Sequence, residues 1–447
     1  MMLNLPAGAA FVLQRLKQNG YQGYVVGGCV RDSLLNRQPK DWDVCTDALP
    51  EDMQRIFRGQ HVIETGLKHG TLTVMYDHEP YEVTTFRVDG EYTDHRHPDE
   101  VRFVKDVAED LARRDFTMNA MAWSPDTGLV DVFGGREDLA AGLIRCVGDA
   151  KMRFGEDALR IMRALRFASV YGFGIEAETS RAIHEMKGNL AGVAAERIRV
   201  ELAKLLCGRG VGAILREYAD VIFAVLPQLA PMHGFDQRTP FHAYDVWEHT
   251  VRAVESVPPT EVLRLTMLLH DSGKPAAFTM DERGVGHAYG HPVISVQIAE
   301  EILAYLRVDH ATRDRVLLLV EAHDMGVTSE RTQLKRRLHK LGEEALWELI
   351  EVKRADALGK GTEEAAVIEA RMDAVRQALR NLLAEQPCVT LRDMAVNGRD
   401  LMAEGVTGKA LGETLNWLLG EVINERLPNE REALMAAARA HRDAENA

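Results

Sequence analysis

Long apolar stretches are absent from this chain of 447 residues. No segment approaches the roughly 18 to 20 consecutive apolar residues that a membrane-spanning helix needs. Residues 1–18 predict a short amphipathic helix without a small-residue cleavage site, so we expect neither a secretory signal nor a membrane partner. The length exceeds one ordinary hydrophobic core, and we therefore expect a globular protein of several domains.

Cysteine is also scarce, and its five positions form no Cys-x-x-Cys pair. The pattern argues against a zinc knuckle and a disulfide framework, and it is typical of reduced thiols in the cytoplasm. The five positions are Cys29, Cys45, Cys146, Cys207 and Cys388.

An excess of positive charge is missing as well, since the formal net charge is −14. This value argues against a protein that coats nucleic acid through a uniformly basic surface. Local basic clusters remain. Each is ordinarily a solvated helix face, and for the last cluster an RNA-binding face fits the pattern equally well. The clusters are Arg113-Arg114, then Arg160, Arg163 and Arg166, and then Arg331, Lys335, Arg336, Arg337 and Lys340.

The sequence pattern changes near residue 145. Before this point, short β-branched or apolar runs alternate with helical stretches, which predicts a small domain with a mixed sheet. After Lys151 the spacing is almost entirely helical, so the predicted fold class is α+β. The expected strands are Tyr24–Val26, Thr71–Tyr76, Glu82–Phe86 and Val101–Val104, and the expected helices are Met152–Tyr171, Glu176–Lys187 and Ala194–Leu206. Domain boundaries are expected within Leu226–Thr239, Val257–Thr260 and Gln386-Pro387.

Two carboxylates, Asp41 and Asp43, follow a Gly27-Gly28 pair that opens a predicted helix. Residues i and i+2 of a strand share a face, so both acids can hold Mg²⁺ against a nucleoside triphosphate. The glycines let the backbone approach the phosphates, and Arg31 adds a fixed positive charge. Such an acid pair is commonly just solvated, but the glycines and Arg31 favour metal binding. Glu82 is the candidate third carboxylate, with a surface strand charge as its alternative.

Two further motifs could bind the phosphates, the ribose and the base of a nucleotide. Arg113-Arg114 suits phosphate oxygens, and the adjoining Asp115 suits a ribose hydroxyl. Asp157 and Arg160 lie three residues apart on a predicted helix, so they share a face and offer acceptors and donors to the edge of a base. Arg163 and Arg166 continue that face. A surface ion pair is the alternative interpretation of the helix taken alone.

These motifs, in this order, resemble those of the class II tRNA nucleotidyltransferases, and the chain is similar to a bacterial CCA-adding enzyme of the polymerase-β superfamily. The resemblance rests on Gly27-Gly28-x-x-Arg31-Asp32, Asp41-x-Asp43, Arg113–Ala120, Asp131–Leu139 and the Glu156-Asp157-x-x-Arg160 helix. It covers essentially the whole chain. It implies a nucleotidyltransferase head (residues 1–145), a helical neck and body (146–235), an HD domain (236–360) and a tail (361–447).

The resemblance also implies a role for each matching residue. Asp41 and Asp43, with Glu82, would be catalytic and would hold Mg²⁺, and the tRNA 3′ end would receive C, C and A from CTP and ATP without a nucleic-acid template. Residues 88–100 resemble the loop used to switch from C to A. The nucleotide-binding residues would be Gly27, Gly28, Arg31, Arg114, Asp115, Asn119, Asp157, Arg160, Arg163 and Arg166.

Histidines and aspartates recur along the later helices, and such a set suits a divalent transition metal. The pair His270-Asp271 resembles the signature of HD domains, whose family chemistry is metal-dependent phosphate-ester hydrolysis. The alternative is a degenerate HD fold that serves only as a scaffold. The expected ligands are His249, His270, Asp271, His291, His323 and Asp356, while His242 is expected to face substrate or to be structural.

Glycines at close spacing near the C-terminus predict tight turns between short helices. These turns can present backbone N–H groups to a phosphate backbone, and they resemble a tail that holds the tRNA elbow. Plain helix packing explains the spacing equally well. The candidate tRNA-binding residues are Gly398, Gly405, Gly408 and Lys409.

The sequence thus predicts a CCA-adding enzyme with tRNA, ATP and CTP as partners and no evident obligate protein partner. A hydrolase for 3′-end repair is expected in the HD domain. Three alternatives stay open at this point: a poly(A) polymerase or a relative that adds only CC or only A, a regulator that nucleotidylates a protein and carries an HD domain, and a noncatalytic RNA-binding scaffold.

Overall fold

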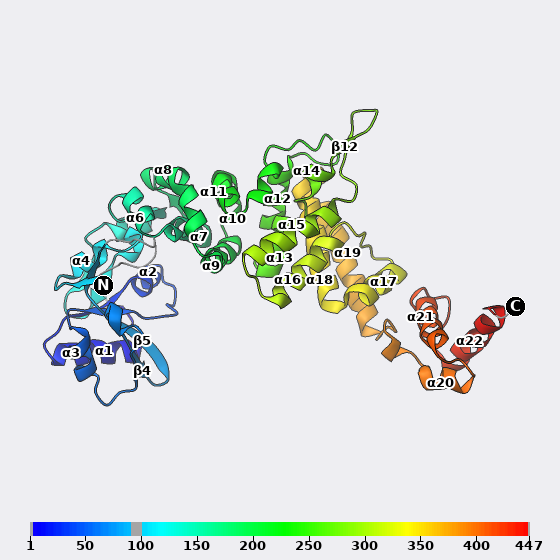
Figure 1. Cartoon of the computed structure of the whole chain (residues 1–447), viewed down its shortest axis with the longest axis horizontal. Helices are drawn as coiled ribbons and strands as arrows, with labels where there is room; N and C mark the ends of the chain where they lie inside the picture. Colours follow the sequence, from blue (N-terminus) through cyan, green and yellow to red (C-terminus); the bar gives the residue numbers. More distant parts are fainter. Residues whose placement is uncertain (1–2, 91–100, 446–447) are drawn as a thin grey trace. The chain divides into compact units, whose positions relative to one another are not determined.

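The computed structural model describes residues 3–90 and 101–445, and the chain divides into two compact units, residues 1–227 and 228–447 (Figure 1). The division falls within the predicted break at Leu226–Thr239. By contrast, Val257–Thr260 only joins two packed helices of the second unit. Most of the predicted switching loop, residues 91–100, lies outside the described residues.

A mixed seven-stranded sheet forms the centre of the first unit, which confirms the α+β prediction. The order is β3-β4-β5-β2-β1-β8-β9, and only the β2–β5 pair is parallel. The strands are β1 (Gly23–Val26), β2 (Val44–Thr46), β3 (Val62–Ile63), β4 (Thr71–Tyr76), β5 (Glu79–Thr85), β8 (Ala122–Ser124) and β9 (Gly128–Val130). Two short pairs lie beside it, β6 (Arg87–Asp89) with β7 (Val101–Phe103) and β10 (Leu143–Ile144) with β11 (Gly174–Ile175).

The register of three central strands positions the acidic residues. Val44 of β2 pairs with Val25 of β1 on one side and with Val83 of β5 on the other, and all three side chains are buried. Extending the β2–β5 register by one residue places Asp43 beside Glu82. The sequence predicts that Asp41 and Asp43 are strand residues, but both lie immediately before β2. The hydrogen bonding to β1 begins at the carbonyl of Asp43, which accepts from the Val26 N–H.

Helices make up most of the rest of the first unit. One predicted helix, Met152–Tyr171, is two helices with an extended residue, Asp157, between them. This break corrects the sequence prediction. The helices are α1 (Ala7–Gln18), α2 (Gly28–Leu34), α3 (Pro50–Ile56), α4 (Val107–Ala112), α5 (Gly135–Ala141), α6 (Ala150–Glu156), α7 (Leu159–Tyr171), α8 (Ala177–Met186), α9 (Ala195–Leu206), α10 (Val211–Glu217) and α11 (Ala219–Val225). Short 3₁₀ turns lie at η1 (Leu67–His69), η2 (Thr117–Asn119), η3 (Lys187–Gly192) and η4 (Pro227–Met232).

The second unit is helical apart from one short hairpin, β12 (Thr279–Met280) with β13 (Gly286–His287). Its first part packs α12 (Val246–Ser256) against α18 (Glu343–Lys360), and α13 (Glu261–Leu269) against α16 (His310–Ala322). The remaining helices of this part are α14 (Lys274–Ala277), α15 (His291–Tyr305), α17 (Arg331–Leu341) and α19 (Ala365–Ala384). None of the helices in the described ranges is both long and apolar enough to cross a bilayer.

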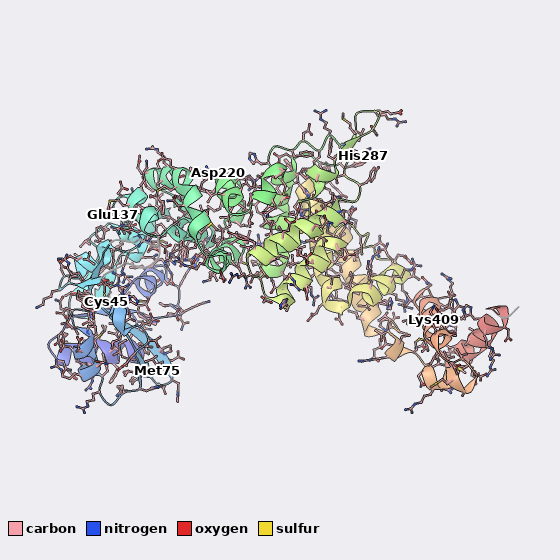
Figure 2. All side chains as sticks on the ribbon, viewed as in Figure 1. Cys45, Met75, Glu137, Asp220, His287 and Lys409 are labelled. Carbon is pink, nitrogen blue, oxygen red and sulfur yellow. The ribbon has the colours of Figure 1, made fainter. Side chains whose placement is uncertain are left out.

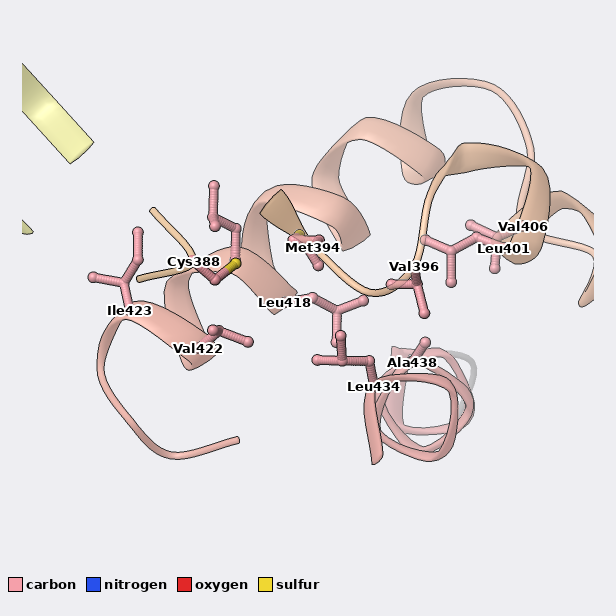
Figure 3. Packing of buried hydrophobic residues seen from close by; sticks show 11 residues of the cluster. Cys388, Met394, Val396, Leu401, Val406, Leu418, Val422, Ile423, Leu434 and Ala438 are labelled. Atoms are coloured by element: carbon pink, nitrogen blue, oxygen red, sulfur yellow. The ribbon is translucent and has the colours of Figure 1, made fainter. Parts of the chain in front are cut away.

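A small separate core closes the C-terminal end of the second unit (Figure 3). It brings Leu401 of α20 (Gly398–Ala403), Leu418 of α21 (Lys409–Ile423) and Leu434 of α22 (Arg431–Glu445) together. The 3₁₀ turn η5 (Leu391–Asp393) precedes these helices. Because α19 packs along α18 instead, the tail core begins near Cys388 and not at residue 361.

Candidate functional site

The turn between β1 and α2 brings an arginine against a glycine. Gly27 has a φ of 77°, which favours glycine, and a Cβ at this position would lie 2.8 Å from an Arg114 guanidinium nitrogen. The helix that follows has only seven residues. Its dipole therefore adds little, and guanidinium groups supply most of the positive charge near this turn.

Asp41 and Asp43 are exposed, and so is Glu82 on the neighbouring strand. Desolvation and then the charge of Glu82 raise the pKa of Asp43, with a smaller contribution from Asp41, while Arg114 lowers it. Three carboxylates thus lie close enough to repel one another. A bound cation would relieve this repulsion, and hard oxygen ligands suit Mg²⁺. The residues present fit the metal that the sequence implies.

The paired arginines are held by a buried acid that the sequence analysis missed. Asp110 of α4 accepts from Arg113 at 2.9 Å and from Arg114 at 3.4 Å. Its own carboxylate is fully buried. Asp110 therefore anchors both guanidinium groups to α4, and the charge of Arg114 also acts on Asp43.

Asp115 is also occupied by protein partners. One oxygen accepts from the Asn119 side chain at 3.0 Å, and the other accepts from Arg163 at 2.9 and 2.6 Å. Burial acts to raise the pKa of Asp115, but Arg163 and Asn119 outweigh it and hold the pKa at about 2. The acid predicted to meet a ribose hydroxyl is thus ionised and orients Arg163.

Arg31 joins the same network from the other side. Its guanidinium donates to Asn119 at 2.6 Å and to Asp32 at 2.9 Å, and it lies over the Phe167 and Tyr171 rings. Asn119 therefore connects Arg31 to Asp115. The phosphate-binding candidates and helix α7 are parts of one hydrogen-bonded structure.

The Asp157 and Arg160 side chains share a helix end, but they have different partners. Asp157 accepts from the Leu159 backbone at 3.0 Å and from Arg197 of α9 at 2.8 Å. Arg160 donates to Glu156 at 2.5 Å and to the Arg113 carbonyl at 3.2 Å. The ion pair considered as the alternative is not formed, because Asp157 bonds to the Leu159 N–H and Arg197 while Arg160 bonds to Glu156.

Arg163 and Arg166 meet a second buried acid that the sequence analysis missed. Glu201 of α9 lies 3.8 Å from Arg163 and 2.5 Å from Arg166. The sequence could have shown that Glu201 is buried, because it lies with Ile198 and Leu205 on the apolar face of an amphipathic helix. A buried acid at such a position indicates a charged partner.

A second site lies in the other unit, where six side chains form two adjoining groups. His249, His270, Asp271 and Asp356 make the first, and Asp271, His291 and His323 make the second. Within each group the ligand atoms lie within 4.8 Å of one another. The Nε2 atoms of His249 and His270 are 3.1 Å apart, and those of His291 and His323 are 3.0 Å apart.

Backbone carbonyls fix the orientation of three of these rings. The Nδ1 atoms of His270, His291 and His323 donate to the Met267, Ala288 and Val320 carbonyls at 2.7, 2.8 and 2.6 Å. In the neutral tautomer the Nε2 lone pairs of His291 and His323 must then face each other. This arrangement is unfavourable without a cation between them, and it matches the way metal-binding histidines are oriented.

The acids of this cluster are kept ionised. Burial acts to raise their pKa values, but His270 beside Asp271, and His249 and Lys360 beside Asp356, hold both well below the usual range. The Lys274 ammonium lies 2.7 Å from Asp271, and Lys360 donates to Asp356 at 2.9 Å. A set of imidazoles and carboxylates fits a divalent transition metal. Gly359 lies under His249, where a Cβ would come within 3.0 Å of Nδ1.

The predicted basic cluster on α17 faces other parts of its own unit. Arg331 pairs with Glu385 and Glu425, Lys335 also pairs with Glu425, and Arg336 donates to Asn424 at 2.7 Å. These contacts join α17 to the ends of α19 and α21. Arg331, Arg336 and Lys340 remain exposed, so part of the cluster is a solvated face that also carries ion pairs within the unit, and an RNA-binding role for it stays a prediction.

The C-terminal glycines differ in their roles. Gly405 and Gly408 have φ values of 85° and 65°, so they make the expected tight turns, whereas Gly398 is the first residue of α20. Lys409 is almost fully exposed and pairs with Glu413. This region therefore places an exposed lysine, paired with Glu413, beside two glycine turns.

Three family models match parts of this chain. The Poly A polymerase head domain covers residues 23–145, the probable RNA and SrmB-binding site of polymerase A covers 172–231, and the putative tRNA nucleotidyltransferase domain 2 covers 293–438. The CCA-adding enzyme of Geobacillus stearothermophilus is 36% identical over 430 residues, which span 95% of this chain and 94% of that protein.

Two further relatives support the same assignment. The CCA-adding enzyme of Oceanobacillus iheyensis is 43% identical over 245 residues, and this match spans 51% of the chain and 61% of that protein. The crystal structure of the Bacillus stearothermophilus CCA-adding enzyme in complex with CTP has 30% identity and a TM-score of 0.71, and it covers 98% of both chains. The chain therefore belongs to the family of CCA-adding enzymes.

Proposed function

We propose that this protein adds C, C and A in turn to the 3′ end of tRNA, using CTP and ATP. One observation carries the proposal: Arg113-Arg114 link the carboxylates to the base-reading helix. Arg114 lowers the pKa of Asp43, and the carbonyl of Arg113 accepts from Arg160. Metal-binding acids, phosphate-binding cations and base-reading groups therefore belong to one site.

The chain's own residues account for each part of the reaction. The terminal 3′-hydroxyl oxygen of tRNA attacks the α-phosphorus, the bond to the β-phosphate bridging oxygen breaks, and pyrophosphate leaves while the hydroxyl gives up its proton. Arg31 and Arg114 would hold the triphosphate, and Asp41, Asp43 and Glu82 would hold Mg²⁺. When bound, Mg²⁺ lowers the cost of charge on the attacking and leaving oxygens.

Asp157 and Arg160 would read the base once it enters. Both are half-buried and already bonded to Arg197 and Glu156. Exchanging those partners for a base edge lets the same two groups serve C and then A. Asp115, Asn119 and Glu201 would act as positioning residues that hold Arg31, Arg163 and Arg166. Addition in the cytoplasm accords with the free thiols.

A defined substrate tests the assignment. Incubation with tRNA lacking its last three nucleotides should give two additions with CTP alone, none with ATP alone and three with both. Arrest at CC with both nucleotides would indicate a CC-only relative. Extension into a long A tail would indicate a poly(A) polymerase, which the head-domain match alone does not exclude.

A second activity, phosphate-ester hydrolysis for repair of damaged 3′ ends, is proposed for the histidine–aspartate cluster. The facing Nε2 atoms of His291 and His323 carry this proposal. A water oxygen would attack phosphorus, and the ester oxygen would leave with a proton. Asp271 and Lys274 lie where they can orient water and ester. A bound divalent metal supplies Lewis acidity.

Tests of this activity need the intact chain. His270→Ala should abolish metal-dependent hydrolysis of a terminal phosphate and reduce the metal content measured after dialysis, while nucleotide addition stays unchanged. The parent protein's failure to hydrolyse such esters with Mn²⁺, Ni²⁺ and Co²⁺ would reject the proposal and leave the cluster as a scaffold.

A further inference from the structure

The histidine–aspartate cluster borders a cavity of about 360 Å³. Asp271, His291, His323 and Asp356 line it, with the ammonium groups of Lys274 and Lys360 beside them. Aromatic side chains line the same cavity. A cavity lined by both charged and aromatic groups fits a ligand that carries both an anionic group and a flat ring.

Two of the aromatic rings are exposed. Tyr289 is 80% and Phe241 is 69% exposed, although both line the cavity. Large rings of this kind are ordinarily covered, and exposed aromatic surface commonly marks a binding site.

Tyr289 is also held in a fixed orientation. The His287 ring stacks on it with centroids 5.0 Å apart and planes 10° apart, and His287 in turn contacts Asp281 at 3.1 Å. His287 ends strand β13 (Figure 2), Asp281 lies in the turn between β12 and β13, and Tyr289 follows two residues after the hairpin. One face of Tyr289 is therefore covered by an anchored imidazole, and the opposite face remains available for a flat ring.

Both rings are close in sequence to polar residues that line the cavity. Tyr289 precedes the cluster residue His291 by two positions, a span of at most about 7 Å. Phe241 precedes His242, whose Nε2 lies 3.2 Å from the Lys274 ammonium. A molecule that reaches the cluster with its phosphate can thus place a ring against Tyr289.

We propose that Tyr289 and Phe241 form a base-stacking platform, so that the cluster acts on nucleotide phosphate esters and discriminates against esters that lack a base. This inference rests on the proposed hydrolase activity and names its substrate class. Stacking on aromatic side chains tolerates every base, because each base has a π-face. Such a site would accept a damaged 3′ end whichever nucleotide terminates it.

The test compares two esters that differ only in the base: adenosine 3′-monophosphate and its abasic counterpart, in which hydrogen replaces adenine. The wild-type protein should have a kcat/KM about tenfold higher for the nucleotide. Tyr289→Ala should remove this preference by lowering only the value for the nucleotide. Tyr289→Phe, which keeps the ring, should preserve it. Tyr305→Ala, an exposed tyrosine of α15 outside the cavity, is the matched control.

Calorimetric binding of adenosine 3′-monophosphate to protein treated with EDTA separates the platform from the hydrolase. Tyr289→Ala should weaken this binding about tenfold, and Tyr305→Ala should leave it unchanged. Equal kcat/KM values for both esters, with equal binding by Tyr289→Ala and the parent, would refute the platform while the hydrolase stands. Nucleotide binding that depends on Tyr289, without hydrolysis of either ester, would refute only the hydrolase.

Discussion

The two sites assemble charge in opposite ways. In the head, the carboxylates Asp41, Asp43 and Glu82 are exposed, while the arginines around them are bonded to acids of the protein. In the second unit, the candidate ligands are buried and three imidazoles are anchored by backbone carbonyls. An exposed acid group exchanges its cation readily, whereas a buried and oriented set retains it. We expect the head to receive Mg²⁺ with each nucleotide and the second site to keep a resident metal.

The largest expected effect comes from the head acids. Asp43→Asn removes a negative charge where metal and triphosphate must meet, so nucleotide addition should fall by about a thousandfold. Hydrolysis of a terminal phosphate by the same variant should match the parent. Both rates are measured on one tRNA preparation. Loss of both activities would show that the two sites are not chemically separate.

Chelation provides the next test of the contrast. After brief EDTA treatment and gel filtration, addition of Mg²⁺ alone should restore nucleotide addition fully. Hydrolysis should resist brief treatment, and once prolonged dialysis removes the metal it should need a transition metal to return. His270→Ala should lower metal affinity by more than about a hundredfold, as judged by metal content. Equal rates of metal loss from both sites would contradict the distinction.

Asp115 gives a pH-dependent prediction for the head. Its folded pKa is about 2, below the ordinary value of 3.8, so ionised Asp115 stabilises the fold above about pH 4 and this contribution disappears as the pH falls toward 2. The difference corresponds to about 2 kcal/mol. Asp115→Asn should therefore be less stable than the parent at pH 7, and the gap should narrow between pH 4 and pH 2 in urea titrations.

Nucleotide binding is the control for this variant. Because Arg163 loses its partner, the KM for CTP should rise, whereas the hydrolase should not change. A stability gap that stays constant down to pH 2 would show that the Asp115–Arg163 pair is not its source.

The smallest effect is expected at the contacts between α17 and the C-terminal core. Glu425→Gln removes the acid shared by Arg331 and Lys335, which lies near the surface, so stability should fall by no more than about 1 kcal/mol. The loss should shrink in high salt, as followed by thermal unfolding. A salt-independent loss would indicate a packing defect instead of an ionic one.

Local patterns were enough to predict three strands of the sheet and the strand that carries Glu82, but β2, β3, β8 and β9 were missed and Val101–Phe103 pairs outside the sheet. Thr71–Tyr76 is a strand with the predicted bounds, because alternation and β-branching act within a few residues. The break at Asp157 was missed, because Ala158 and Leu159 favour helix while the capping carboxylate depends on a long-range partner, Arg197. Helical spacing alone cannot reveal such a contact.

The partners of the arginines were hidden for the same reason. Glu201 lies in a different helix from Arg163 and Arg166, and Glu425 is 94 residues from Arg331. A basic cluster on one helix therefore looks the same in sequence whether it meets RNA, water or a carboxylate of the same chain. The metal-type cluster was easier to predict, because imidazoles and carboxylates in such numbers have few other uses.

The contact between Gly359 and His249 affects how easily the proposed phosphate-ester hydrolysis is lost in evolution. A single methyl group there would press on the His249 ring and its carbonyl, yet α18 would still form, since alanine favours a helix more than glycine does. One nucleotide change in the gene would then disturb the histidine–aspartate cluster proposed to hydrolyse phosphate esters, without touching the residues of the first unit. In a lineage without selection for end repair, this single substitution would therefore leave a domain that keeps its helical fold but has lost its metal-binding geometry.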